Sequence, residues 1–186
     1  MTDASNSLGE DLRALRTARK MTLEELAQRL GRSVGWLSQI ERDISTPRMS
    51  DLREIADIFG VQLSLFFGNT GAPANEQGRI VRAGARRVIG ERNQGLVETL
   101  ISPDLTDSFE MIHSTFQPGS RRVQLISRPT QEVAYMVSGK LDIWLNDEKF
   151  TVETGDSFRI RDASYRWENP YSEPAVAVWV ISPPVY

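Results

Sequence analysis

TLEELAQRLGRSVGWLSQIER, residues 22–42, is the stretch that decides the fold of the N-terminal half. Thr22 and Glu25 form a capping box, in which each side chain can accept a hydrogen bond from the backbone N–H of the other residue. Gly31 can end the helix that begins there, and Ser33 can cap a second helix. The stretch therefore predicts two short helices joined by a three-residue turn, which is the geometry of a helix-turn-helix.

Apolar residues at helical spacing extend this pattern on both sides. They recur over residues 8–15 and again over residues 52–59, where Ser50 can start a fourth helix. A short fifth helix is expected near Ser64–Phe67. Five short helices on about 60 residues predict an all-α domain over residues 8–67.

The helical spacing stops at residue 68. Residues 68–78 are rich in turn-forming residues and are expected to be a linker. Farther along, short β-branched and aromatic segments alternate with turn signals, which predicts an all-β domain over residues 79–186, a sandwich, jelly roll or small barrel. The expected strands are Glu110–Phe116, Arg121–Ile126, Val133–Val137, Leu141–Leu145, Ser157–Ile160 and Ala175–Ile181.

The composition excludes several kinds of chemistry. The 186 residues include no cysteine and one histidine, which excludes disulfides, zinc fingers, iron–sulfur clusters, and any one-chain metal site with several imidazoles. A net charge of -3 gives no overall basic field that would attract nucleic acid or a membrane. The first seven residues lack the regions of a signal peptide, and no apolar run is long enough to cross a bilayer. We therefore expect a cytoplasmic protein with no membrane partner.

Residues 8–67 resemble the phage-repressor-like (XRE-type) helix-turn-helix family. The resemblance lies in the segments Leu12–Arg16, Thr22–Ala27, Leu37–Arg42, Pro47 and Leu52–Gly60. The sequence departs from the family at Arg32, where a small apolar residue is usual, and at Asp43, where glycine is usual. The resemblance implies a transcriptional regulator that binds double-stranded DNA. Because one such domain would bind weakly, we expect a homodimer on a pseudo-palindromic operator. It also implies that Arg16 and Glu41 form an ion pair that locks the first helix to the reading helix.

The resemblance places the helix Val34–Glu41 in the major groove. Gln39 can pair with an adenine edge and Val34 can touch a thymine methyl group, while arginines nearby can contact phosphates. The expected DNA-binding residues are Arg32, Val34, Gly35, Trp36, Ser38, Gln39, Arg42 and Arg48. Residues 1–67 carry nine basic and ten acidic side chains, so the usual basic footprint is missing. The alternative is a helical protein-interaction module.

Residues from Glu110 to Ile181 resemble the cupin family, whose fold is a small jelly-roll barrel. The resemblance lies in Pro118-Gly119, Glu132–Leu141, Gly155–Phe158 and Tyr165–Asn169. Metal-binding cupins hold their ion with histidines and a glutamate, and here the histidine positions are occupied by Ile126 or Ser127, Arg128 and Tyr165. Only Glu132 remains, and one carboxylate is not a transition-metal site, so no metal and no cofactor are expected. The sole histidine, His113, is interpreted as a core or rim residue.

We expect the barrel to bind a small-molecule effector instead of a metal. Strand parity places Arg122, Gln124 and Ile126 on one face, and the expected ligand-binding residues are Arg122, Gln124, Arg128, Glu132 and Tyr165. Two arginines and a glutamate suit a carboxylate-bearing metabolite such as an amino acid. The alternative at this site is an ion-pair network without a ligand.

Two other functions stay open beside the ligand-responsive regulator. One is a cupin-type enzyme tethered to a DNA-binding domain, in which Glu132 and Tyr165 would transfer protons. The other is an antitoxin-like regulator whose β domain binds a protein. No catalytic residues are assigned, and we expect the chain not to be an enzyme.

Overall fold

The computed structural model describes residues 8–67, 73, 75–76, 78–89 and 95–185. The described residues form two compact units. The first holds the helices, the residues up to Ile89 and the segment Ser102–Asp107, and the second holds residues 95–101 and 108–185. Residues 79–89 thus group with the helices, although the sequence pattern placed them with the strands. One reason is Asp11, which pairs with Arg87 at 2.8 Å and accepts a hydrogen bond from the N–H of Leu105 at 3.2 Å. The expected linker, residues 68–78, lies largely outside the described residues.

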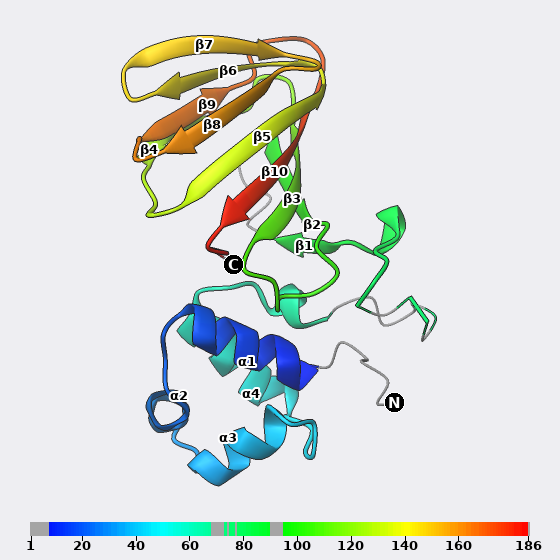
Figure 1. Ribbon diagram of the computed structural model, residues 1–186, viewed down its shortest axis with the longest axis vertical. Coiled ribbons are helices and arrows are strands. Elements are labelled where there is room, and N and C mark those ends of the chain that lie inside the picture. The colour runs from blue at the N-terminus through cyan, green and yellow to red at the C-terminus, as the bar shows by residue number, and fades with distance from the viewer. Residues whose placement is uncertain (1–7, 68–72, 74, 77, 90–94, 186) are drawn as a thin grey trace. The chain divides into compact units, whose positions relative to one another are not determined.

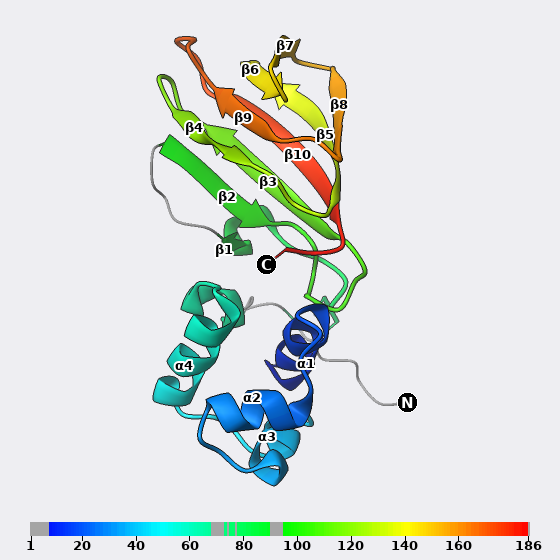
Figure 2. The same ribbon diagram turned by 90° about the vertical axis from the view of Figure 1, so that its left-hand side faces the viewer.

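The helical unit contains four α-helices within its described residues (Figure 2). They are α1 (Leu8–Ala18), α2 (Leu23–Arg29), α3 (Val34–Ile40) and α4 (Met49–Phe59). The prediction of a fifth helix is wrong, because these residues form only a 3₁₀ turn, η1 (Leu63–Phe66). Nucleating an α-helix is unfavourable, and a single turn has too few hydrogen bonds to offset it. The core is made by one apolar stripe from each helix, with Leu15, Leu26, Leu37 and Ile55 fully buried.

The predicted caps set the helix-turn-helix geometry. Thr22 Oγ1 accepts from the N–H of Glu25 at 3.1 Å, and Glu25 Oε2 accepts from the N–H of Thr22 at 2.7 Å. Ser33 Oγ accepts from the N–H of Trp36 at 3.1 Å and begins α3. Gly31, with a φ of 60°, makes the left-handed turn between α2 and α3 that other residues rarely adopt. The capping box and the turn are therefore confirmed.

The second unit is built from antiparallel strands, and the all-β prediction is confirmed. One sheet runs in the order β2-β3-β10-β5-β8, and the other in the order β4-β9-β6-β7 (Figure 1). A short β1 (Arg87–Ile89) belongs to the first unit and follows the turn η2 (Ala83–Ala85). The strands of the second unit are β2 (Leu96–Leu100), β3 (Glu110–Phe116), β4 (Arg121–Ile126), β5 (Gln131–Ser138), β6 (Lys140–Leu145), β7 (Glu148–Glu153), β8 (Ser157–Arg161), β9 (Tyr165–Glu168) and β10 (Ala175–Ser182).

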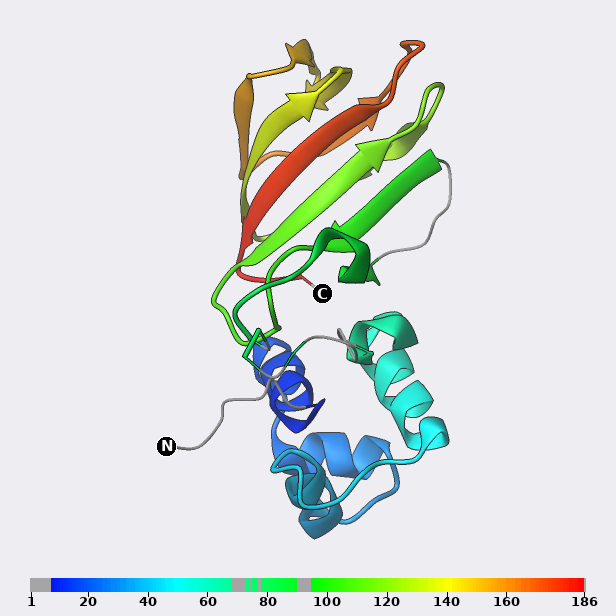
Figure 3. The same ribbon diagram turned by 90° about the vertical axis from the view of Figure 1, so that its right-hand side faces the viewer.

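Aromatic contacts join the inner faces of the two sheets. The Phe116 ring of β3 meets the Trp167 ring of β9 edge to face at 4.7 Å between centroids, and Tyr165 of β9 stacks on Trp179 of β10 at 6.4 Å. Burial alternates along β3, where every second residue from Glu110 to Phe116 is buried. Figure 3 shows β10, in red, beside β3, in green, at the centre of the larger sheet. The inner faces of β3, β10 and β5 therefore form one side of the core.

No helix among the described residues is long and apolar enough to cross a membrane.

Candidate nucleic-acid interface and ligand site

The helix α3 has one buried and one exposed face. Leu37 and Ile40 are buried in the helical core. Val34, Gly35 and Gln39 are exposed, and the predicted residues Trp36 and Ser38 are half-buried between the two faces. Helical periodicity thus turns most of the predicted reading residues toward solvent.

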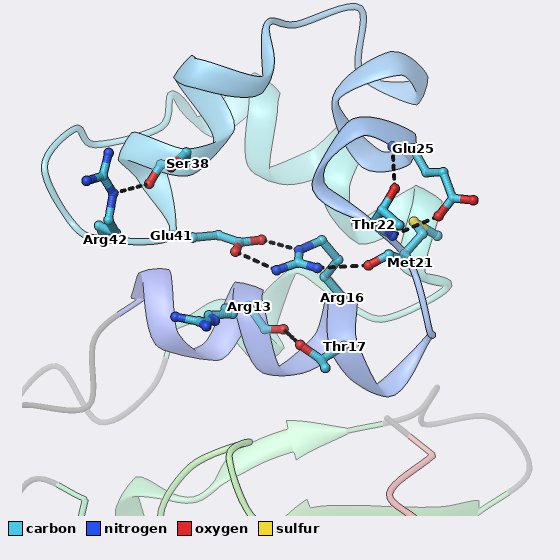
Figure 4. A network of polar contacts seen from close by, with 9 residues as sticks. All are labelled: Arg13, Arg16, Thr17, Met21, Thr22, Glu25, Ser38, Glu41 and Arg42. Carbon is cyan, nitrogen blue, oxygen red and sulfur yellow. Dashed lines mark hydrogen bonds and ion pairs between the residues drawn. The ribbon is translucent and has the colours of Figure 1, made fainter.

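Arg16 and Glu41 form the predicted ion pair that fastens α1 to the end of α3 (Figure 4). Arg16 Nε donates to Glu41 Oε1 at 2.6 Å, and Nη2 donates to Glu41 Oε2 at 2.9 Å. Arg16 Nη1 also donates to the carbonyl of Met21 at 2.8 Å, next to the start of α2. The Arg16 and Glu41 side chains are 13% and 5% exposed, so this bidentate ion pair is part of the core.

The three predicted phosphate-binding arginines differ in their surroundings. Arg42 is exposed, and its Nε donates to the carbonyl of Ser38 at 3.0 Å, which holds it beside the last turn of α3. Arg48 is exposed just before α4. Arg32 is engaged within the protein, because its Nη2 lies 2.5 Å from Asp51 Oδ1 and its guanidinium lies 5.2 Å from the centre of the Trp36 ring. Arg42 and Arg48 are thus the two with fewer internal partners.

Gln39 is partly oriented by its own loop. Its Oε1 accepts a hydrogen bond from Ser45 Oγ at 3.1 Å, and its backbone carbonyl accepts from the N–H of Ile44 at 2.9 Å. The side-chain amide keeps two N–H donors, and Oε1 has a second lone pair. These are the groups that a bidentate contact to adenine requires.

In the second unit the structure brings together two of the predicted ligand-binding residues. Glu132 of β5 is 1% exposed. Its Oε1 accepts from Thr130 Oγ1 at 2.8 Å, and its Oε2 accepts from the Tyr165 hydroxyl at 3.2 Å. Burial and the charge of Glu132 raise the pKa of Tyr165, so the hydroxyl stays a hydrogen-bond donor.

The other three predicted ligand-binding residues are exposed. The register places Arg122 opposite Trp167 and Ile126 opposite Tyr165, so Arg122 and Ile126 share the sheet face of those buried rings. The pairing between β4 and β9 is irregular: Ile126 lies four positions after Arg122 on β4, but their partners Tyr165 and Trp167 are only two positions apart on β9. Arg122, Gln124 and Arg128 are exposed, and among the described residues neither arginine lies within 4.0 Å of a carboxylate.

Further polar groups, which the sequence pattern did not predict, lie on the inner face of the larger sheet. Glu110 is 1% exposed; its Oε1 accepts from the N–H of Val185 at 3.0 Å. Burial raises the pKa of Glu110 to about 7. Glu98 of β2 accepts from Ser114 Oγ at 3.0 Å, and burial raises its pKa as well. The regular alternation of β3 could have identified Glu110 as inward-facing, because it shares the parity of buried Phe116.

The inner face does not fit a metal ion. No group of three or more His, Cys, Asp or Glu side chains in the described part of the chain could hold one. Both carboxylate oxygens of Glu132 already accept hydrogen bonds, and the sole histidine, His113, lies on the alternate, half-buried face of β3. The donor set of metal-binding cupins is therefore absent from these positions.

Comparisons with known proteins agree with this two-part architecture. The helix-turn-helix domain family matches residues 7–66, and the cupin domain family matches residues 112–181. The HTH-type transcriptional regulator PuuR of Escherichia coli (strain K12) is 25% identical over 163 residues, 86% of this chain and 85% of that protein. The immunity repressor protein of Bacillus phage phi105 is 34% identical over 71 residues, 38% of this chain and 49% of that protein.

A solved structure supports the fold of the second unit. The RmlC-like cupin of Shewanella frigidimarina covers 57% of this chain and 91% of its own, with 14% identity and a TM-score of 0.50. Both domain matches agree with the helix-turn-helix geometry and with the similarity to a transcriptional regulator over 86% of this chain. The chain is thus a transcriptional regulator of the phage-repressor-like helix-turn-helix type that carries a cupin domain.

Proposed function

We propose that this regulator binds a pseudo-palindromic operator as a homodimer and changes its DNA binding when its cupin domain binds a small metabolite. The observation that carries the proposal is the exposed face of α3, which presents Val34, Gly35 and Gln39 on a helix fixed by the Arg16–Glu41 pair. In helix-turn-helix proteins this is the helix that enters the major groove. A DNA-binding regulator acts where the chromosome is, which in a bacterium is the cytoplasm.

Within the proposed interface, side chains divide into base readers and phosphate contacts. Gln39 contacts an adenine edge and Val34 contacts a thymine methyl, with Gly35 and Ser38 allowing close approach. Arg42 and Arg48 contact phosphates. Arg32 and Trp36 flank the groove while the Arg32 guanidinium stays over the Trp36 ring. Arg32 also keeps its ion pair with Asp51.

A homodimer supplies the second reading helix, since one nearly neutral helical domain would bind DNA weakly. We place the second copy on the outer face of the larger sheet. Val133 and Tyr135 of β5 and Val180 of β10 are 41%, 52% and 39% exposed, and Val180 lies opposite Val133. Sedimentation of the full chain tests this, with a dimer mass expected and a monomer at micromolar concentration contradicting it.

The effector lies between the two sheets, against Glu132 and Tyr165, and acts without a metal and without being chemically changed. Exposed Arg122, Gln124 and Arg128 complete the proposed contacts and suit the carboxylate of an amino acid or similar metabolite. Since Glu132 and Tyr165 hydrogen-bond each other, their first role is to shape this surface.

The experiment that tests the DNA interface is operator binding by fluorescence anisotropy, on sequences first selected from random DNA with the full chain. Gln39→Ala should weaken binding roughly 5- to 150-fold, the loss of about 1–3 kcal/mol for one bidentate base contact, and should relax the preference at one base pair. Arg42→Ala should weaken binding to all sequences alike. Arg53→Ala, an exposed arginine on α4 outside the interface, is the matched control. Unchanged affinity in both test variants would reject the assignment.

A further inference from the structure

Three carboxylates lie on the inner side of the larger sheet without a cation in contact. Ile181 of β10 pairs with Glu110 on one side and with Glu132 on the other, so these two glutamates occupy one row across the sheet. Glu98 pairs with Ser114, four residues farther along β3. In the described part of the chain, none of the three forms an ion pair with a lysine or an arginine. Buried carboxylates normally have such a partner, because burial removes the water that stabilises their charge.

Two buried polar atoms near this row have no hydrogen-bond partner among the described residues. They are Glu110 Oε2, an acceptor, and Trp179 Nε1, a donor. Trp179 lies two residues before Ile181 on β10, on the same inner face, and pairs with Ala134 of β5. Its ring is stacked on Tyr165, whose hydroxyl donates to Glu132. Because buried polar atoms are normally hydrogen-bonded, the unpaired acceptor Glu110 Oε2 and the unpaired donor Trp179 Nε1 favour a ligand that carries both a donor and an acceptor.

The nearby arginines do not take the place of such a ligand. Arg122 and Arg128 are exposed and form no ion pair with the buried Glu110 or Glu132, so Arg128 lowers the pKa of Glu110 only from a distance, and burial still raises it. The surrounding aromatic rings, Trp179 and Tyr165, are favourable neighbours for a cation. Charge, burial and unmet hydrogen bonds therefore favour a positively charged group between the sheets.

We propose that Glu110 and Glu132 bind the ammonium group of a small organic cation whose oxygen accepts a hydrogen bond from Trp179 Nε1. This rests on the proposed function and names the class of its effector, a primary amine with an oxygen acceptor. The Trp179 and Tyr165 rings cover the carbon chain of the ligand. An anionic metabolite without an amine is rejected by the same carboxylates.

Three four-carbon probes that differ only at one end test the class of ligand. 4-Amino-1-butanol carries an ammonium, 1,4-butanediol a neutral hydroxyl and 4-hydroxybutyrate a carboxylate. Thermal unfolding of the full chain, followed by tryptophan fluorescence at matched ionic strength, should shift upward with the amino alcohol alone. Equal shifts with all three probes, or none with the amino alcohol, would overturn the proposal. A shift with 4-hydroxybutyrate alone would overturn the amine and keep an effector-binding cupin domain.

Variants then test the residues. Glu110→Gln and Glu132→Gln should each lower the affinity for 4-amino-1-butanol at least tenfold, while Glu148→Gln, an exposed glutamate on β7, should leave it unchanged. Unchanged affinity in both test variants would remove the carboxylates from the site. If the amine binds but operator affinity does not change, the ligand assignment stands and the proposed regulation fails.

A measurement on the unaltered chain covers the case in which a variant does not fold. Glu110 is faced by Glu98 of β2, Glu132 of β5, Arg128 and the N–H of Val185, and burial sets its pKa at about 7. Since an ammonium needs the ionised carboxylate, affinity should fall by up to tenfold per pH unit below 7 and level off above it. Affinity that stays constant between pH 6 and 8 would contradict a role for Glu110.

Discussion

Removing the Arg16 guanidinium should strongly destabilise the helical unit. In Arg16→Ala the two hydrogen bonds to Glu41, at 2.6 and 2.9 Å, and the one to the Met21 carbonyl, at 2.8 Å, are lost. A carboxylate that is 5% exposed then stays buried without a cation. Breaking a buried ion pair from one side costs about 3–5 kcal/mol, a large part of the roughly 5–15 kcal/mol that stabilises a domain.

The pair as a whole should matter much less than either partner alone. Arg16→Met combined with Glu41→Leu removes both charges and fills a similar volume with apolar atoms, a change that is often neutral or stabilising in buried pairs. We therefore expect the double variant to regain most of the stability that Arg16→Ala loses. If it also keeps operator affinity, the pair acts through the fold and not through a DNA contact.

Urea unfolding of the full chain, followed by circular dichroism at 222 nm, measures these changes because the helical signal comes from the first unit. Arg13→Ala, an exposed arginine on the same helix, is the control and should stay within about 0.5 kcal/mol of the unaltered protein. A loss under about 1 kcal/mol for Arg16→Ala, or a double variant as unstable as the single one, would refute the reasoning.

Two further predictions concern the β unit. In Gly139→Ala, at a φ of 77°, the new Cβ would lie 2.5 Å from the carbonyl oxygen of Pro174. The control Gly155→Ala has a φ of 93° but no atom near the new Cβ, so Gly139→Ala should unfold at the lower temperature. Equal decreases in unfolding temperature would contradict the clash. The pKa of Glu110 is raised from 4.5 to about 7, so the folded state holds its proton more tightly than the unfolded state does. The stability that this proton contributes, about 3 kcal/mol, is complete below pH 4.5 and is lost as pH rises through 7. Glu110→Gln should flatten this decline in unfolding free energy between pH 4.5 and 7, and an unchanged slope would show that another group causes it.

The helices and most of the core strands follow from local signals in the sequence. Caps such as Thr22 and Ser33 depend on residues at most three positions away, and β3 and β4 have the predicted bounds. The sequence pattern missed β7 because it has one buried residue, Val152, among exposed ones and so lacks apolar alternation. It missed β9 because a strand of four residues is too short to show a period.

The candidate sites were predictable only where one element presents the residues. The exposed face of α3 follows from helical periodicity. The Arg32–Asp51 pair joins residues 19 positions apart, and no local pattern predicts that it engages a candidate phosphate contact. The row of Glu110 and Glu132 depends on β10 lying between β3 and β5, a pairing of strands distant in sequence.

The internal ion pairs of the helical unit affect how the regulator discriminates its operator from the rest of the chromosome. Arg16 and Arg32 neutralise Glu41 and Asp51, so these two of the nine basic side chains in residues 1–67 add little to the positive potential that would attract DNA phosphates. Binding to random DNA comes from counterion release at phosphates, and it should be weak here, with a shallow dependence on salt concentration. Competing chromosomal sites would then sequester little of the protein, and occupancy of the operator would be governed by the base edges that α3 is proposed to contact.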